Sequence, residues 1–472
     1  MILPASKQRP PYTDGYASDE GGWARPADWL PLPPDVPGEE KVSLLCAVRE
    51  DGSNFITVGL GGKYLVDWGD GSAPTNHNSN AKASHNLSWA GCSSATLTSE
   101  GFRQAMITIT PQVATPDHLS AFGIWYADVP PPGAWTGSPV LEAWVSLPYC
   151  STTGLNSAFS GRARMMRFCT LRNIGGATYL SSVFANCVAL EEVRIPANTS
   201  GLGFLVGTFT GCSSMIRAPF FDTSNVTNIG SLFSGCLNLK EIPPYDFRKV
   251  LNANAAFTSC RELTRTAPVD LSAATDVSGL YNECSSLVEV GDLDFRSALT
   301  ALQLFTRCFS LKRVGTVDLR AATTLNQAFF ACSALRSVAG ITTGAALVNV
   351  NSCFYTSTAL EEPPLFGTSE VTDAGYFLSE TASLRKVPAF NLGKATTITN
   401  IFSGAVTLGS MKATGIKETF SLLNAALTAA SLNEIYTNLA TVTGKTITVT
   451  GNPGTTGDDP TIATAKGWTV IG

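Results

Sequence analysis

A motif of four apolar residues recurs along most of the chain and constrains its fold more than any other feature. In one copy, Phe184 is followed at intervals of three residues by Cys187, Leu190 and Val193. Repeats of such a length stack as the coils of a solenoid, because one coil cannot bury its apolar face alone. Copies begin every 24 or 25 residues, at Trp135, Phe159, Phe184, Phe209, Phe233, Phe257, Tyr281, Phe305, Phe329, Phe354, Leu378 and Phe402.

The local pattern predicts the structure of one coil. Apolar residues alternate from Leu190 to Ile195, which indicates a short strand. An apolar residue lies four before most motif starts, and this spacing predicts a turn or two of α- or 3₁₀-helix. The sixth residue after each motif start should face the core, and Leu141 and Met165 hold this place in the first two copies. We therefore expect a mainly β protein with short helices, whose solenoid of about 12 coils spans residues 129–415.

The motif resembles the BspA-like, or Treponema-type, branch of the leucine-rich repeats over about 280 residues. The resemblance implies a right-handed solenoid with a parallel sheet on its concave side. The family includes bacterial surface adhesins and phage structural proteins.

Cysteines hold the second place of seven consecutive motifs. Cysteine is a small apolar residue when buried, so we predict that the column fills a narrow slot in the core. Disulfides between coils are an alternative with poor geometry, because stacked side chains point the same way. A metal column is a further alternative, but it lacks the paired spacing of thiolate sites. The column comprises Cys187, Cys212, Cys236, Cys260, Cys284, Cys308 and Cys332.

Aspartates recur 13 residues after the start of five motifs, and Asn391 takes the same place later. Carboxylates stacked about 5 Å apart repel one another unless each is satisfied locally. We predict Asx turns, in which each carboxylate accepts backbone N–H bonds. A column of bound cations is the alternative. The aspartates are Asp222, Asp246, Asp270, Asp294 and Asp318.

Charge alternates in sign at the place eight residues after each motif start. This place flanks the inward valine, so we expect it to point outward from the concave face. Opposite charges on neighbouring strands stabilise a sheet, which favours a structural ladder of ion pairs. The alternative is a recognition stripe for a zwitterionic or sugar ligand. The alternating run is Arg167, Glu192, Arg217, Glu241, Arg265, Glu289 and Arg313.

Residues 1–40 predict an extended arm, because eight prolines oppose regular structure. An arm with exposed aromatic residues gains order by docking on a partner. We expect Trp23, Arg25, Trp29 and Leu30 to make that contact; a plain disordered tail is the alternative. A tryptophan–proline arm ahead of a sandwich resembles phage tail and baseplate accessory proteins.

Residues 41–128 predict a β-sandwich, with strands at 42–48 and 106–110. Between them, Tyr64-Leu-Val-Asp-Trp-Gly-Asp-Gly-Ser72 resembles the turn signature of PKD-type immunoglobulin-like domains. The resemblance implies a tryptophan in the core, a tight Gly-Asp-Gly turn, and a spacer or adhesive support. Asp67 and Asp70 should cap the turn, with calcium binding as the alternative.

Residues 416–472 predict an α/β cap, which an exposed end coil needs. Ser431 and Glu434 form a capping box for a helix. A strand at 445–450, a short helix opened by Asp459 and ended by Gly467, and a strand from Trp468 should follow.

Composition excludes several functional classes. Charged residues are 15% of the chain and the net charge is −5, unlike the basic footprint of a nucleic-acid-binding protein. No run of 18 apolar residues predicts a membrane span, and the first residues do not read as a signal peptide. The three histidines, His77, His85 and His118, have no metal-ligand spacing. We expect no enzyme activity, no cofactor and no metal.

These features together predict a bacteriophage virion protein, made in the host cytoplasm. We expect a tail fibre or baseplate-attached protein whose arm docks on other virion proteins and whose solenoid contacts a host surface glycan or protein. A purely structural or decoration protein of the virion and a bacterial BspA-like surface adhesin are the alternatives. An oligomer is expected, of an order that the sequence does not specify.

Overall fold

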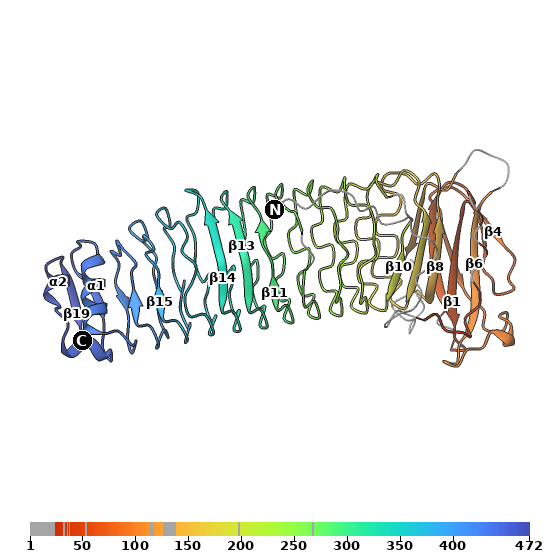
Figure 1. Cartoon of the computed structure of the whole chain (residues 1–472). Helices are drawn as coiled ribbons and strands as arrows, with labels where there is room; N and C mark the ends of the chain where they lie inside the picture. Colours follow the sequence, from red (N-terminus) through yellow and green to blue (C-terminus); the bar gives the residue numbers. More distant parts are fainter. Residues whose placement is uncertain are drawn as a thin grey trace.

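The computed structural model describes residues 24–31, 34, 36, 38–51, 54–112, 118–125, 138–196, 199–266 and 269–472. The chain forms one elongated stack, with a β-sandwich at one end, solenoid coils along the middle and a small α/β unit at the other end (Figure 1). The predicted fold class is confirmed: the described residues are mainly β, with only two short α-helices.

The regular elements are short, as expected for coils of this length. The strands are β1 (Lys41–Val48), β2 (Phe55–Gly61), β3 (Tyr64–Asp67), β4 (Thr75–His77), β5 (Lys82–Asn86), β6 (Arg103–Pro111), β7 (Ala121–Trp125), β8 (Val140–Ser146), β9 (Phe168–Asn173), β10 (Glu192–Arg194), β11 (Glu289–Val290), β12 (Leu293–Asp294), β13 (Arg313–Leu319), β14 (Ser337–Thr343), β15 (Lys386–Val387), β16 (Ser410–Met411), β17 (Phe420–Ser421), β18 (Lys445–Thr448) and β19 (Trp468–Ile471). The helices are α1 (Ala429–Asn438) and α2 (Thr461–Thr464), with 3₁₀ turns η1 (Ser94–Thr96) and η2 (Pro453–Thr456).

One sheet joins the sandwich to the solenoid. Its strand order is β10-β9-β8-β1-β6-β3-β4, and β8, β9 and β10 already pair in parallel as coil strands. β1 pairs antiparallel with both β8 and β6. A second sheet, of order β5-β2-β7, packs on the first through a shared apolar core. The sheet therefore has no break at the predicted boundary between sandwich and solenoid.

The turn after β3, at residues 67–72, has the expected local structure. Trp68 is buried, and its indole N–H donates to Thr75 at 3.1 Å. Asp67 and Asp70 each accept the backbone N–H two residues ahead, at 3.0 and 3.2 Å. Both carboxylates therefore cap the turn, as predicted.

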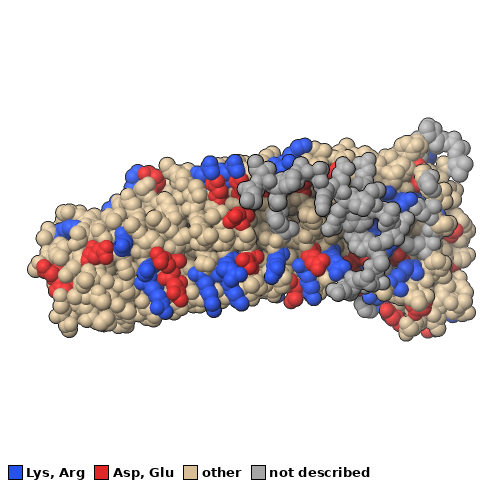
Figure 2. Space-filling model, viewed as in Figure 1, with Lys and Arg blue, Asp and Glu red and all other residues tan. Residues whose placement is uncertain are grey.

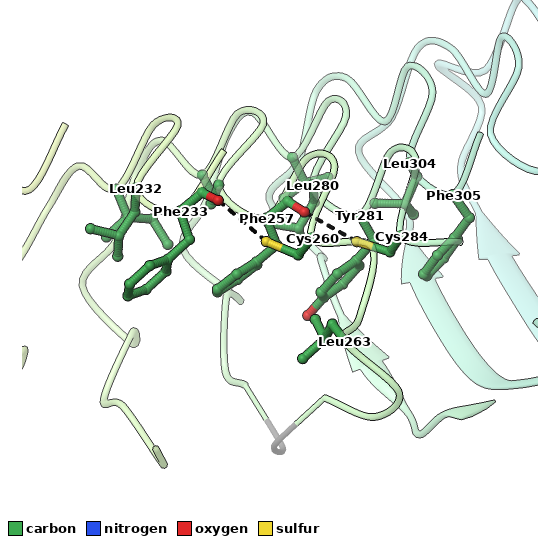
Figure 3. Close-up of a cluster of buried hydrophobic side chains, with 14 of the residues drawn as sticks. Leu232, Phe233, Phe257, Cys260, Leu263, Leu280, Tyr281, Cys284, Leu304 and Phe305 are labelled. Carbon is green, nitrogen blue, oxygen red and sulfur yellow. Dashed lines mark hydrogen bonds between the residues drawn. The ribbon is translucent and has the colours of Figure 1, made fainter. Parts of the chain in front are cut away.

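Aromatic side chains stack through the solenoid core. The rings of successive motif starts from Phe159 to Phe354 have centroids 5.1 to 5.9 Å apart. Figure 3 shows four of these rings, Phe233, Phe257, Tyr281 and Phe305, in their column beside the cysteines. Stacked rings bury large apolar areas, so this column supplies much of the core that one coil lacks.

The cysteine column is buried, and none of its thiols forms a disulfide. Each thiol donates to the carbonyl of the motif start one coil earlier: Cys260 to Phe233 at 3.2 Å and Cys284 to Phe257 at 3.1 Å (Figure 3). Ser357 holds the same place later, and its hydroxyl donates to Phe329 at 2.8 Å. The predicted role as a buried slot-filling residue is confirmed.

The predicted helix ahead of each motif is wrong. The segment instead forms turns, in which the residues two before and two after the motif start have positive φ, as at Ala255 (φ 54°) and Ser259 (φ 59°) beside Phe257. All three of these residues donate their N–H to the next coil at 2.7 to 3.0 Å. The residues with positive φ direct every second N–H group along the rod axis, where it donates to the next coil. In a helix these N–H groups would instead bond to carbonyls of the same helix.

The register of the first two motifs is one residue away from the prediction. In the parallel pairing, Glu142 lies opposite Phe168, and Phe168 lies opposite Glu192. Consequently Met166 enters the solenoid core, whereas Leu141 and Met165 pack on the opposite face of the sheet. A slip of one residue exchanges the two faces of a strand.

The C-terminal unit continues the coil stack. β17, β18 and β19 pair in parallel, so each adds a strand as the coils do. α1 begins after Thr428, whose hydroxyl accepts the N–H of Ser431 at 3.2 Å. The predicted N-cap, Ser431, therefore lies inside the helix, while the short helix α2 and the last strand from Trp468 occur as expected.

Candidate functional site

A stripe of charged side chains follows the outward face of the coil strands, and Figure 2 shows both signs of charge interleaved along the rod. These residues lie seven or eight places after each motif start. We call this surface the charged stripe. It comprises Arg167, Glu191, Glu192, Arg217, Lys240, Glu241, Arg265, Glu289, Lys312, Arg313, Arg336, Glu361, Glu362, Arg385 and Lys386.

Ion pairs within the stripe join neighbouring coils. Arg217 pairs with Glu241 at 3.4 Å, and Arg313 pairs with Glu289 at 2.9 Å. The hydrogen bond and charge of Arg313, together with the charge of Arg265, lower the pKa of Glu289. These side chains are 45% to 68% exposed, so water and salt weaken their attraction.

The first part of the ladder pairs differently from the prediction. Arg167 contacts Glu191 at 2.8 Å, and Glu192 instead pairs with Arg194 of its own strand at 3.0 Å. The one-residue register shift explains this change, because Phe168 and not Arg167 lies opposite Glu192.

Lys312 and Arg336, like Lys240 and Arg265, have no ion pair among the described residues. Lys312 and Arg336 lie on neighbouring coils, where the Arg336 N–H donates to the Lys312 carbonyl at 3.0 Å. Both are exposed; Lys312 precedes Arg313, and Arg336 precedes Ser337, the register partner of Arg313. This part of the stripe therefore carries an excess of positive charge over the one carboxylate, Glu289, that pairs with it.

The aspartate column is a set of Asx turns, as predicted. Each side chain accepts the backbone N–H two residues ahead, at 2.9 to 3.3 Å. Arg248, Arg296 and Arg320 also pair with the aspartates that precede them. Each carboxylate is thus satisfied within its own coil, which removes the need for bound cations.

Residues 24–31 form a strap across the outward face of β1, β6 and β8. Arg25 Nε donates to Glu142 Oε2 at 2.9 Å, and its guanidinium also binds the carbonyls of Trp29 and Leu30. Gln104 accepts the Leu30 N–H at 2.7 Å and donates to the Asp28 carbonyl at 2.7 Å. Polar contacts therefore hold the strap along its whole length.

The strap corrects the prediction of an exposed docking arm. Trp29 is only 5% exposed and packs with Leu45, Phe102 and Leu141 on the face opposite the main core. Arg25, Trp29 and Leu30 therefore contact the protein's own sheet. Trp23 lies outside the described residues.

Sequence reasoning missed Glu142, the strap's partner. Its side chain is fully buried, and burial raises its pKa while the charge and hydrogen bond of Arg25 lower it. Glu142 is the only charged residue in the apolar run of β8, and that contrast was a usable signal. In the parallel register, Glu142 lies opposite Phe168, which in turn lies opposite Glu192 of the charged stripe. The strap therefore covers the start of the sheet face that carries the stripe.

A second column of Asx turns was also missed. Five residues before the motif starts, Asn228, Asn252, Asp276, Asn349 and Asp373 each accept the N–H two residues ahead, at 2.8 to 3.0 Å. The recurrence of Asn and Asp at this place was visible in the sequence. The column is structural, because its backbone bridges hold consecutive coils together.

Histidine and acidic groups in the sandwich serve the turn. His85 Nε2 lies 2.8 Å from the buried Asp70 carboxylate and stacks on Trp68. Across the part of the chain that the structure describes, no group of three or more His, Cys, Asp or Glu is arranged to hold a metal ion. Within those same residues, no helix has the length and apolar character needed to cross a bilayer.

Comparison with known families supports the repeat assignment. Residues 178–293 and 299–413 match the family described as "Mycoplasma protein of unknown function, DUF285". The matched segments cover most of the solenoid, and together with the β-solenoid they are consistent with a BspA-like repeat protein. No curated protein matches the chain.

Proposed function

We propose that this chain is a non-enzymatic bacteriophage virion protein, a tail fibre or baseplate-attached rod whose solenoid contacts the host surface. The observation that carries the proposal is the unbroken stacking. One sheet runs from the sandwich into the first coils, and parallel pairing continues into the C-terminal unit. A repeat stack of this kind behaves as a stiff rod, which suits a part that must project from a particle.

The charged stripe is the proposed contact surface. It is exposed over most of the rod, and the excess positive charge at Lys312, Arg313 and Arg336 would attract a carboxylate or phosphate group of a surface polymer. The self-paired members of the stripe would keep the coils in register. The strap occupies Trp29, so attachment to the particle would use other surfaces of the sandwich end.

The self-pairing of the stripe also favours a second function, a structural rod of the virion without receptor contact. In that case the ion pairs serve only the stack. A bacterial BspA-like surface adhesin is the remaining alternative, which the family match to the solenoid favours.

Two measurements separate these functions. Antibodies against the full chain should label the tail fibre or baseplate of purified virus particles in electron micrographs. Labelling of bacterial envelopes alone would favour the adhesin. Purified full-length protein should also reduce adsorption of the particles to host cells. Labelled particles without such competition would favour the structural rod. The absence of both particle labelling and competition would overturn the proposal.

A further inference from the structure

Trp125, at the end of β7, differs from the other tryptophans of the described chain. It is 43% exposed, whereas Trp89 is partly buried and Trp29, Trp68, Trp144 and Trp468 are at most 6% exposed. An isolated exposed apolar side chain needs no explanation, but an aromatic ring held in a fixed position on a surface does.

Two glycines give the ring its position. Gly59 on β2 and Gly123 on β7 are register partners on the outward face of the second sheet. A Cβ atom at Gly59 would lie 2.8 Å from Trp125 Nε1, and one at Gly123 would lie 3.3 Å from it. The indole therefore lies close over both glycines, and a side chain at Gly59 would have to displace it. Glycine weakens a strand interior, so glycine at both Gly59 and Gly123 indicates that another group approaches the backbone closely at this point.

Cationic groups reach the ring from both of its sides. Lys82 lies on β5, which borders β2, and its Nζ is 5.0 Å from the ring centroid. Arg162 follows the coil segment that hydrogen bonds to β7, and its Cζ is 5.1 Å from the same centroid. These distances are within the range of cation–π attraction.

Polar groups complete the surface. Ser84 is exposed two residues after Lys82 on the edge strand β5, and its hydroxyl lies 2.9 Å from that of Thr57. Thr57 is the register partner of Trp125. An aromatic platform, two cations and a hydroxyl thus lie on one face at the junction of sandwich and solenoid.

We propose that Trp125, Lys82 and Arg162 form a binding site for an acidic sugar residue of a polysaccharide. One face of a pyranose ring carries C–H groups, whose partial positive charge suits the negative π face of an indole. The carboxylate of a uronic acid complements the two cations, and the ring hydroxyls can bond to Ser84. The inference rests on the proposed contact with a host surface and names the chemical class of the ligand.

Titration calorimetry of the full chain tests the site. Oligogalacturonate is the acidic probe, and dextran oligomers are the neutral probe. We expect the acidic probe to bind, with an affinity that falls about tenfold in Trp125→Ala and less in Lys82→Gln. Phe309→Ala removes another aromatic side chain that is 50% exposed, and it should leave binding unchanged. Chemical unfolding should show that all three variants remain folded.

Each other outcome overturns the site. Absence of binding by the acidic probe, equal binding of Trp125→Ala, or equal binding of dextran would each contradict the proposal. If the acidic probe fails while the protein still blocks particle adsorption, the sugar site fails and the proposed function stands. If the probe binds through Trp125 but adsorption is unaffected, the site stands and the receptor-contact function fails.

Discussion

Arg25 and Glu142 form an ion pair across 117 positions of sequence, with Nε and Oε2 2.9 Å apart and the glutamate side chain fully buried. The pair fixes the strap to the strand that joins the sandwich to the solenoid. Glu142 Oε1 has no hydrogen-bond partner among the described residues, so Arg25 supplies most of the compensation for this buried charge.

Removal of the cation should therefore destabilise the protein. We expect Arg25→Ala to lose about 3 kcal/mol of unfolding free energy, because it leaves a buried carboxylate unpaired. Glu142→Gln should lose less, and the double variant should recover part of the loss. Urea unfolding checks the series; an Arg25→Ala protein as stable as the parent would contradict it.

The pH dependence of the same variant gives a second readout. Burial raises the pKa of Glu142, so at a pH between its usual pKa and the raised pKa the folded state binds more protons than the unfolded state. Stability from this group is present below its usual pKa and decreases as the pH rises through the raised pKa. Without Arg25 the pKa should rise further, so Arg25→Ala should be less destabilised at pH 5 than at pH 8.

Asp70 should determine how the stability of the sandwich decreases at acidic pH. Burial alone would raise its pKa, but hydrogen bonds from Ser72, Ser88 and His85 lower the pKa to about 2. The stability it contributes is complete above its unfolded pKa and disappears as the pH falls toward 2, an effect of about 2 kcal/mol. Chemical unfolding between pH 2 and pH 7 should show this decrease, and Asp70→Asn should flatten it while lowering stability at pH 7.

The cysteines should be inert in the folded protein. All 12 are buried, and burial raises the pKa of Cys236 to about 12 and that of Cys212 well above its usual range. Because the thiolate is the reactive form, a thiol reagent should react with almost none of them until the chain unfolds. Rapid reaction of several thiols in the native protein would disprove the buried column.

The left-handed turn positions offer a reciprocal pair of substitutions. Ala255 has φ 54°, and Gly279 holds the same place one coil later with φ 63°. Ala255→Gly should stabilise the protein by about 1 kcal/mol, because glycine adopts this conformation without strain. Gly279→Ala should destabilise the protein by a similar amount through backbone strain. No steric clash should add to this, since the added Cβ would meet no atom closer than 3.6 Å. Thermal unfolding of both variants would test this, and shifts of the same sign would contradict it.

The ion pairs of the charged stripe should respond to salt. Glu289→Gln removes the partner of Arg313, so it should lower the unfolding midpoint at low ionic strength. The difference should become much smaller in about 1 M NaCl, where the Debye length is only about 3 Å. Glu262→Gln is the control, because Glu262 has no ion pair among the described residues. A loss of particle or ligand binding by a fully stable Glu289→Gln protein would instead support a recognition role.

The sequence by itself determined the repeat. The 24- or 25-residue spacing, the buried aromatic and cysteine columns and the Asx turns all depend on contacts within a coil or with its neighbours. Such contacts recur at a fixed separation, so a periodic sequence records them. The left-handed turns were less accessible, because Ala255 and Gln303 adopt positive φ without the glycine that normally signals it.

Only the tertiary structure decided what happens at the sandwich end. The strap pairs with Glu142 and buries Trp29 through contacts between segments far apart in sequence, which no periodicity records. The first coils pair with β1 of the sandwich, and this contact sets a register one residue from the one that the motif spacing predicted. In a strand, that single residue decides which side chains enter the core and which remain on the surface.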